Sequence, residues 1–226
     1  MSKISSILEW FFNASIPLSD TQNVALREVV GVTLGLTSAF LGARRKVLAW
    51  PIGIIADGLL VTVFLGAIFA FGDSSQHANF YGQAGRNLLL IAVSAYGWFK
   101  WARYRNRNAQ HIAVSPRWMT SQERLIAIPI TAVFFIVSYS VFRVLGESGH
   151  WLLVDTWIFT GTALATFGMS RGYIEFWLAW IAVDLVGVPF AFSNGYYPTA
   201  TLYAVYLPFV SWGFLTWRRI LRSESI

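Results

Sequence analysis

The sequence predicts an all-α integral membrane protein with seven transmembrane helices in a 3+1+3 arrangement of two parallel repeats. Three observations predict it: an apolar composition, seven long apolar runs, and a repeat between the two ends of the chain. Of the 226 residues, 56% are hydrophobic and 12% are charged, which is about half the charged share of a soluble protein. A soluble core of this size could not bury so much apolar surface, whereas lipid solvates it. The chain has no cysteine, which excludes disulfides and thiol chemistry.

Seven runs have the length of a membrane span, which is about 20 mostly apolar residues. We predict helices because an open sheet would leave unpaired backbone groups in lipid, and because the runs lack the alternation of barrel strands. The predicted spans are Val24–Ala43, Val47–Gly72, Phe80–Ala102, Leu125–Leu145, Leu152–Met169, Tyr173–Ser193 and Thr199–Ile220.

The segment before the first span has an apolar run that is too short to cross the membrane. Residues Ile4–Leu18 have the character of an amphipathic segment that lies in the interface. No cleavable signal peptide is expected, because a basic stretch and a long apolar core are missing from the first residues. Whether residues 4–18 cross the membrane is left open.

The basic residues predict the orientation. Although the net charge is +6, these residues lie in short gaps between apolar runs, which favours membrane topology over nucleic-acid binding. With seven spans, 13 of the 17 Lys and Arg residues fall on one side. The positive-inside rule then predicts a bacterial-type inner membrane protein with the N-terminus outside and the C-terminus in the cytoplasm. The 13 residues are Arg44, Arg45, Lys46, Lys100, Arg103, Arg105, Arg107, Arg117, Arg124, Arg171, Arg218, Arg219 and Arg222.

The two ends of the chain resemble each other. Leu48–Asp57 matches Glu175–Asp184, and Tyr96–Arg103 matches Trp212–Arg219. The matched residues are Trp50 with Trp177, Asp57 with Asp184, Gly97 with Gly213, and Trp101 with Trp217. The alternative is that tryptophan recurs because it favours the membrane interface.

The repeat predicts the organisation of the chain. An odd linker helix lets both helical triplets enter the membrane in the same orientation, so that the two bundles can rock around a site between them. The expected parts are an interfacial segment (1–22), a first three-helix bundle (23–104), a basic loop and linker helix (105–150), a second three-helix bundle (151–221) and a cytoplasmic tail (222–226).

Ionisable residues inside spans are costly and are candidates for function. Asp57 lies in the second predicted span, Arg86 in the third and Asp184 in the sixth. For Asp57 and Arg86 a structural or coupling role is expected, with mutual pairing as the structural alternative. The span of Asp184 holds no basic residue, which favours a functional role.

Aromatic and amide residues share faces with these groups. Trp177, Trp180 and Asp184 have helical spacing, as do Trp50 and Asp57, and an aromatic wall beside a carboxylate suits a planar cationic or polar ring. The alternative is that the tryptophans anchor the helices at the interface.

A second set offers hydrogen bonds. Gln83 and Asn87 are four residues apart, and Tyr203 matches Asn87 in the repeat. Amides pair with a carboxamide or with ribose hydroxyls. The alternative is hydrogen bonding between helices. The predicted substrate-binding residues are therefore Trp50, Gln83, Asn87, Trp177, Trp180, Asp184 and Tyr203.

Other chemistries lack their residues. A retinal protein needs a lysine within the last helix, and the only lysines are Lys3, Lys46 and Lys100. No metal cluster, phosphate-binding loop or dinucleotide fingerprint is present. We therefore expect no enzyme, no catalytic residue, no metal and no cofactor.

Two stretches resemble the PnuC family of vitamin transporters. They are Gln83–Trp101, preceded by Trp50-Pro51-Ile52-Gly53, and Glu175–Asp184 followed by Thr201–Trp217. The resemblance extends from about Leu34 to Arg219. It implies a fold similar to that of the SWEET sugar transporters.

The resemblance also implies a function. It implies facilitated diffusion (uniport) of nicotinamide riboside for NAD biosynthesis, with uptake driven by phosphorylation and hence dependent on a cytoplasmic riboside kinase. The expected partners are this small molecule and membrane lipid, with no nucleic acid, and a homo-oligomer is left open. The alternatives are transport of another vitamin such as thiamine or riboflavin, transport of a sugar, or a sensor or scaffold that transports nothing.

Overall fold

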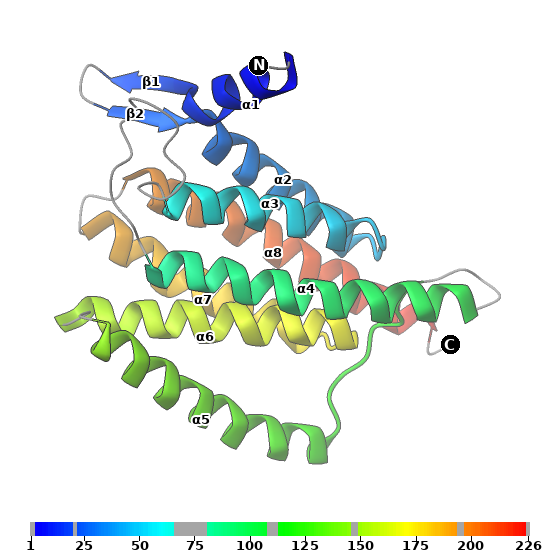
Figure 1. Ribbon diagram of the computed structural model, residues 1–226. Coiled ribbons are helices and arrows are strands. Elements are labelled where there is room, and N and C mark those ends of the chain that lie inside the picture. The colour runs from blue at the N-terminus through cyan, green and yellow to red at the C-terminus, as the bar shows by residue number, and fades with distance from the viewer. Residues whose placement is uncertain are drawn as a thin grey trace. The chain divides into compact units, whose positions relative to one another are not determined.

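The computed structural model describes residues 3–19, 22–65, 81–107, 113–145, 149–193 and 197–224. Within these residues the chain forms eight helices and one two-stranded antiparallel hairpin (Figure 1). The strands are β1 (Ser15–Ser19) and β2 (Gln22–Ala25). The helices are α1 (Lys3–Asn13), α2 (Leu26–Ala43), α3 (Ala49–Phe64), α4 (Tyr81–Arg107), α5 (Ser121–Val144), α6 (Gly149–Arg171), α7 (Glu175–Ser193) and α8 (Tyr197–Glu224).

Each predicted span overlaps one of the helices α2 to α8, so the helical class is confirmed. The first span begins two residues too early, because Val24 and Ala25 belong to β2, and residues 66–72 and 80 of the second and third spans lie outside the described residues. Three stretches in the described residues are long and apolar enough to cross a membrane: α2, α5, and Leu152–Arg171 of α6. Helix α3 is apolar but shorter. Crossing by all seven helices stays a prediction.

The N-terminal segment contains a hairpin that the sequence reading did not predict. Helix α1 ends at Asn13, and β1 pairs with β2 from Ser15 opposite Ala25. Pro17, which would break a continuing helix, lies in β1, where the hairpin has a free edge. The backbone N–H of Leu26 donates to the carbonyl of Ala14 over 2.8 Å, which ties the start of α2 to the hairpin.

The chain divides into two compact units, Met1–Trp98 and Phe99–Ile226, with the boundary inside α4. In the first unit, α2 packs closely on α3. The hydroxyl of Ser38 donates to the carbonyl of Ala49 over 2.8 Å, and a Cβ at Gly31 would lie 3.1 Å from the Leu60 side chain. Small residues therefore let these two helices approach each other.

In the second unit, α6 packs on α7 and α7 on α8. A Cβ at Gly161 would overlap Val183, and one at Gly168 would lie 2.9 Å from Cβ of Phe176. Helix α7 is thereby held along the length of α6, which fixes the position of the polar residues that α7 carries.

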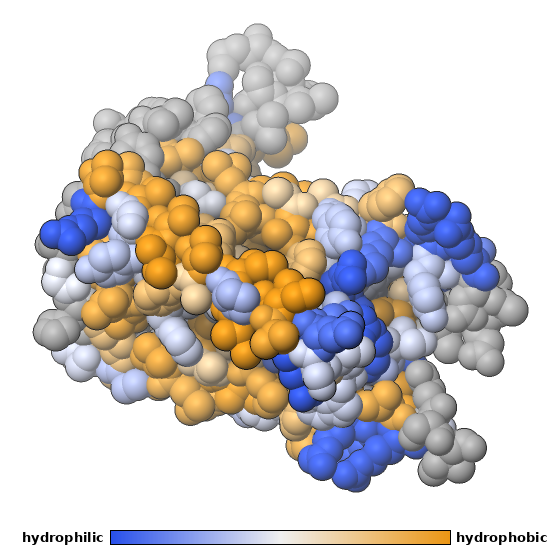
Figure 2. Space-filling model, turned by 90° about the horizontal axis from the view of Figure 1, so that it is seen from below, coloured by the Kyte–Doolittle hydropathy of each residue, from blue (hydrophilic) through white to orange (hydrophobic). Residues whose placement is uncertain are grey.

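Aromatic contacts join helix α5 to α6. Phe159 stacks on Phe134 with ring centroids 5.5 Å apart, and Phe142 meets it edge-on at 5.2 Å. Between Leu125 and Val141 the exposed side chains of α5 are mostly apolar, as at Ile128 and Val133. Hydrophobic side chains cover much of the face seen in Figure 2, and hydrophilic residues gather toward one end. Such a surface suits lipid as its solvent.

Candidate functional site

One contact occurs in both halves of the internal repeat. The ring of Trp50 lies on Gly97, and the ring of Trp177 lies on Gly213. Both tryptophans are buried, and a Cβ at either glycine would overlap the ring. The repeat predicts this correspondence, since it pairs the same four residues.

The ring of Trp177 belongs to a packed aromatic cluster. Its ring centroid lies 6.0 Å from that of Trp217, at an interplanar angle of 76°. Phe176 meets Trp217 edge-on at 5.0 Å, and Trp101 lies 6.4 Å from Trp217. The ring faces of Trp177 are thus used largely in packing, and what it retains for a ligand is its indole N–H. That buried nitrogen has no hydrogen-bond partner among the described residues.

Asp184 is the buried carboxylate of the second repeat. It is 2% exposed, and its Oδ2 has no hydrogen-bond partner within the described parts of the chain. The Oγ1 of Thr160 on α6 is also buried and without such a partner there. An unpaired buried polar atom costs about 1–3 kcal/mol, so atoms of this kind point to a ligand or an ordered water.

The contacts between α6 and α7 place Thr160 and Asp184 on adjoining turns. The indole N–H of Trp157 donates to the carbonyl of Ala182 over 3.2 Å, and Gly161 faces Val183. The turn of α6 that carries Thr160 therefore lies against the turn of α7 that leads to Asp184. A hydroxyl and a carboxylate at this junction can together bind a donor and an acceptor.

Tyr203 on α8 lies close to the same stretch of α7. A Cβ at Gly187 would lie 2.9 Å from its ring, and Gly187 is three residues, almost one helical turn, after Asp184. Tyr203 and Trp180 are both half-buried. Four predicted substrate residues lie in the second unit. Helix α7 carries Trp177, Trp180 and Asp184 on one face, and α8 carries Tyr203, whose ring lies close to α7.

The predicted residues of the first unit have a different electrostatic setting. Asp57 is half-buried and is influenced by the charge of Arg86, and direct pairing of the two groups stays a prediction. No cation in the described residues acts on Asp184 in this way. Asn87 is buried at 2% exposure, and Gln83 lies on α4 with a side chain outside the described part.

Thr160 and Gly187 were not singled out from the sequence. Thr160 has a sequence signal, because α6 carries several threonines inside an apolar span, with two pairs spaced four residues apart. In the structure all four are buried: Thr156, Thr160, Thr162 and Thr166. Gly187 has no comparable signal, since its role appears only when Tyr203 is seen against it.

A polar cluster at the start of α5 was also missed. Thr120 and Glu123 form a capping box, in which the Glu123 N–H donates to Thr120 Oγ1 over 3.2 Å. The carboxylate of Glu123 also accepts two hydrogen bonds from Arg117, at 2.6 and 2.8 Å, and one from Tyr173 at 2.8 Å. The Glu123 hydrogen bond raises the pKa of the Arg117 guanidinium above its usual value.

The segment before α5 is fastened to the turn between α6 and α7. The Arg117 N–H donates to the carbonyl of Gly172 over 2.9 Å, and the Ile174 N–H donates to the carbonyl of Arg117 over 3.0 Å. Gly172 has a φ of +78°, and a Cβ there would lie 2.7 Å from Val114. Only glycine fits this turn without strain, because of both the angle and the neighbour.

Comparison with known proteins identifies the family. The model of the nicotinamide mononucleotide transporter family matches residues 25–219, which is most of the chain. The chain belongs to this family. The match covers every helix from α2 to α7 and most of α8, so the candidate residues described above all lie within it.

The relatives of this chain are named for different vitamins. The chain is 34% identical to the riboflavin/roseoflavin transporter RibM of Streptomyces davaonensis over 218 residues, which is 96% of each chain. It is 23% identical to the nicotinamide riboside transporter PnuC of Escherichia coli, over 79% of each chain.

A solved structure shares the fold. The crystal structure of the vitamin B3 transporter PnuC matches with a TM-score of 0.67 and 18% identity, over 87% of this chain and 82% of the other. The resemblance to the PnuC family is thereby confirmed. The chain is a multi-pass membrane transporter of the vitamin-carrying PnuC family, and its relatives are transporters rather than enzymes.

Proposed function

We propose that this chain moves riboflavin across the cytoplasmic membrane by facilitated diffusion. The observation that carries the proposal is the set of buried polar atoms without partners around α7: Asp184 Oδ2, Trp177 Nε1 and Thr160 Oγ1. A carboxylate accepts from a ring N–H or a hydroxyl, an indole N–H donates to a ring carbonyl, and a hydroxyl does both. Riboflavin offers all of these groups on its ring and its ribityl chain.

The choice of riboflavin rests on the relative that this chain matches over almost its whole length. That relative carries riboflavin or roseoflavin in its name and is 34% identical, against 23% for the relatives named for nicotinamide riboside. The composition of the candidate site supports a large flat ring, since Trp180 and Tyr203 are half-buried beside Asp184 and Gly187.

Nicotinamide riboside, which the sequence resemblance implies, is the second candidate. The relative from Escherichia coli that is named for nicotinamide riboside favours it, and the family description names the related nicotinamide mononucleotide. Its carboxamide and ribose match the same donors and acceptors, and its cationic ring would be attracted by the Asp184 carboxylate. The two substrates differ in ring size and in charge, which makes them separable by experiment.

The proposal includes the predicted topology and the predicted driving force. Two like-oriented triplets, α2 to α4 and α6 to α8, with α5 as linker, would present the site to each side in turn. Net uptake would come from phosphorylation of the vitamin by a cytoplasmic kinase. The same tryptophan–glycine contact occurs in both triplets, which supports their proposed equivalence.

A thermal-shift panel tests the substrate. Purified protein is heated with riboflavin, nicotinamide riboside, thiamine or ribose, because a ligand that binds only the folded state raises the unfolding temperature. We expect the largest shift with riboflavin. A shift with nicotinamide riboside and none with riboflavin would reverse the order, and a protein that none of the vitamins stabilises would favour the sensor or scaffold alternative.

A further inference from the structure

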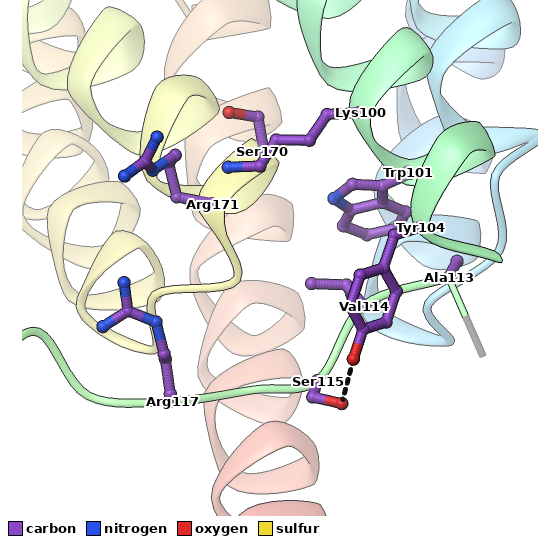
Figure 3. Close-up of a pocket in the computed structure, with 9 residues that line it drawn as sticks. All are labelled: Lys100, Trp101, Tyr104, Ala113, Val114, Ser115, Arg117, Ser170 and Arg171. Carbon is purple, nitrogen blue, oxygen red and sulfur yellow. Dashed lines mark hydrogen bonds between the residues drawn. The ribbon is translucent and has the colours of Figure 1, made fainter. Parts of the chain in front are cut away.

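A cavity of about 370 Å³ lies within the second unit, and none of the predicted substrate residues lines it. It is formed where the last turns of α4, the segment that precedes α5 and the end of α6 meet (Figure 3). Its volume is within the range of about 300–1,000 Å³ that small-molecule sites occupy. The lining residues are Lys100, Trp101, Tyr104, Ala113, Val114, Ser115, Arg117, Ser170 and Arg171.

The charge of this cavity is one-sided. Three of its nine lining residues are cationic, namely Lys100, Arg117 and Arg171, and none of the nine is acidic. The charges of Arg171 and Arg117 both act against that of Lys100, so each arginine is close enough to Lys100 to repel it. A bound anion would offset this repulsion.

The three cations have different roles. Arg117 is held in place by its bidentate pair with Glu123, at 2.6 and 2.8 Å, and that carboxylate balances much of its charge. The excess positive charge therefore comes mainly from Lys100 and Arg171. Arg171 is steadied by its Nε, which donates to the hydroxyl of Tyr173 over 3.3 Å.

The walls of the cavity add hydroxyl groups and one aromatic surface. The Tyr104 hydroxyl lies 3.3 Å from Ser115 Oγ, and either atom can turn its proton toward a ligand. Trp101 is buried at 1% exposure. In Figure 3, Lys100 extends toward Ser170, and the two arginines lie on the side opposite Trp101 and Tyr104.

We propose that this cavity binds the phosphate of a phosphate-bearing anion, either a phospholipid headgroup or a small phosphate ester such as a phosphorylated vitamin. Guanidinium groups match phosphate oxygens through paired N–H donors, and an ammonium adds a point charge. A basic pocket beside membrane helices is also a setting in which anionic headgroups bind. The inference does not depend on which vitamin the chain transports.

Binding to purified protein in uncharged detergent tests the proposal. One arm titrates ribose 5-phosphate, with ribose as the control that lacks phosphate, and the other compares phosphatidylglycerol with phosphatidylcholine. The dissociation constant is measured from the rise in unfolding temperature. We expect saturable binding in at least one arm, and the arm that responds identifies the source of the phosphate.

Two variants and a matched control locate the binding. Lys100→Gln and Arg171→Gln should each weaken it at least 10-fold. Arg105→Gln removes one positive charge from an exposed position on α4 that does not line the cavity, so it should change binding less than 2-fold. Because two separate variants are used, a folding defect in one leaves the other to decide. The proposal is overturned if neither arm binds, or if the control weakens binding as much as the two cavity variants.

Discussion

At the scale of single residues, Asp184 and Asp57 occupy equivalent positions and differ in their surroundings. Asp57 interacts with the charge of Arg86, whereas Asp184 has a buried Oδ2 with no partner in the described residues. The repeat thus contains one carboxylate that is influenced by a nearby cation and one whose Oδ2 has no partner among the described residues. A buried charge without a partner is costly, and in a transporter such a group is expected where a ligand supplies the missing contact.

This difference gives a prediction for Asp184→Asn. The change keeps the side-chain volume and removes a charged acceptor, and a hydrogen bond to a charged group contributes about 1.5–3 kcal/mol. We expect riboflavin binding to weaken roughly 10-fold to 100-fold, measured by titration of purified protein. Asp57→Asn is the matched control and should mainly affect stability. Equal loss of binding in both variants would contradict the assignment.

Trp177 has two separable roles at this scale, packing and hydrogen bonding. Trp177→Phe keeps an aromatic ring on Gly213 and removes the indole N–H, whose nitrogen has no partner in the described residues. We expect binding to weaken about 5-fold, in line with a loss of about 1 kcal/mol, with only a small change in unfolding temperature. A large fall in unfolding temperature with unchanged binding would show that the residue only packs.

At the scale of secondary-structure elements, tryptophan–glycine contacts join helices in both halves. A Cβ at Gly97 or Gly213 would overlap a buried tryptophan ring, whereas a Cβ at Gly58 or Gly85 meets nothing within 4 Å. Substitutions at these four glycines can therefore distinguish the effect of close packing from the general effect of replacing glycine in a helix.

We predict that Gly97→Ala and Gly213→Ala each destabilise the protein by about 1–3 kcal/mol, the usual cost of overpacking. Gly58→Ala and Gly85→Ala should leave the unfolding temperature unchanged or raise it slightly, because alanine favours helix more than glycine. Thermal unfolding of the four purified variants is the measurement. Similar effects in all four would mean that the contacts do not hold the helices together.

The element scale also shows what could be predicted from sequence. The spacing of Trp50 to Asp57 and of Trp177 to Asp184 predicted which helices correspond, and the glycines matched with them are in contact with those tryptophans. Apolar length predicted the helices because backbone pairing in lipid leaves few alternatives. The hairpin at Ser15–Ser19 was missed, because its few residues were read as part of an amphipathic segment.

The missed parts of the sites depend on contacts between distant segments. Thr120 and Glu123 have the spacing of a capping box, which is a sequence signal. The hydrogen bonds that Glu123 accepts from Arg117 and Tyr173 have no such signal. Tyr173, for example, is 50 positions away from Glu123 in the sequence. Basic residues such as Lys100 and Arg171 were used to predict orientation, and charge alone does not reveal that they line one cavity.

At the scale of the whole molecule, the repeat and the distribution of basic residues together predict on which side each terminus lies. We predict that an odd number of spans puts the two termini on opposite sides, and that the positive-inside rule puts the C-terminus and most basic residues in the cytoplasm. Reporter tags on the two ends, tested for access to a reagent that does not cross membranes, measure this directly. Access to the N-terminal tag alone is expected. Tags that respond alike would contradict two like-oriented triplets joined by α5.

The central claim is that the chain by itself lets riboflavin cross a membrane down its gradient. Riboflavin uptake into liposomes that contain only the purified protein tests this most directly, with protein-free liposomes and Asp184→Asn as controls. The account predicts saturable uptake that stops at equal concentrations and is unchanged by imposed proton or sodium gradients. Accumulation that follows an ion gradient, or uptake no faster than in protein-free liposomes, would contradict it.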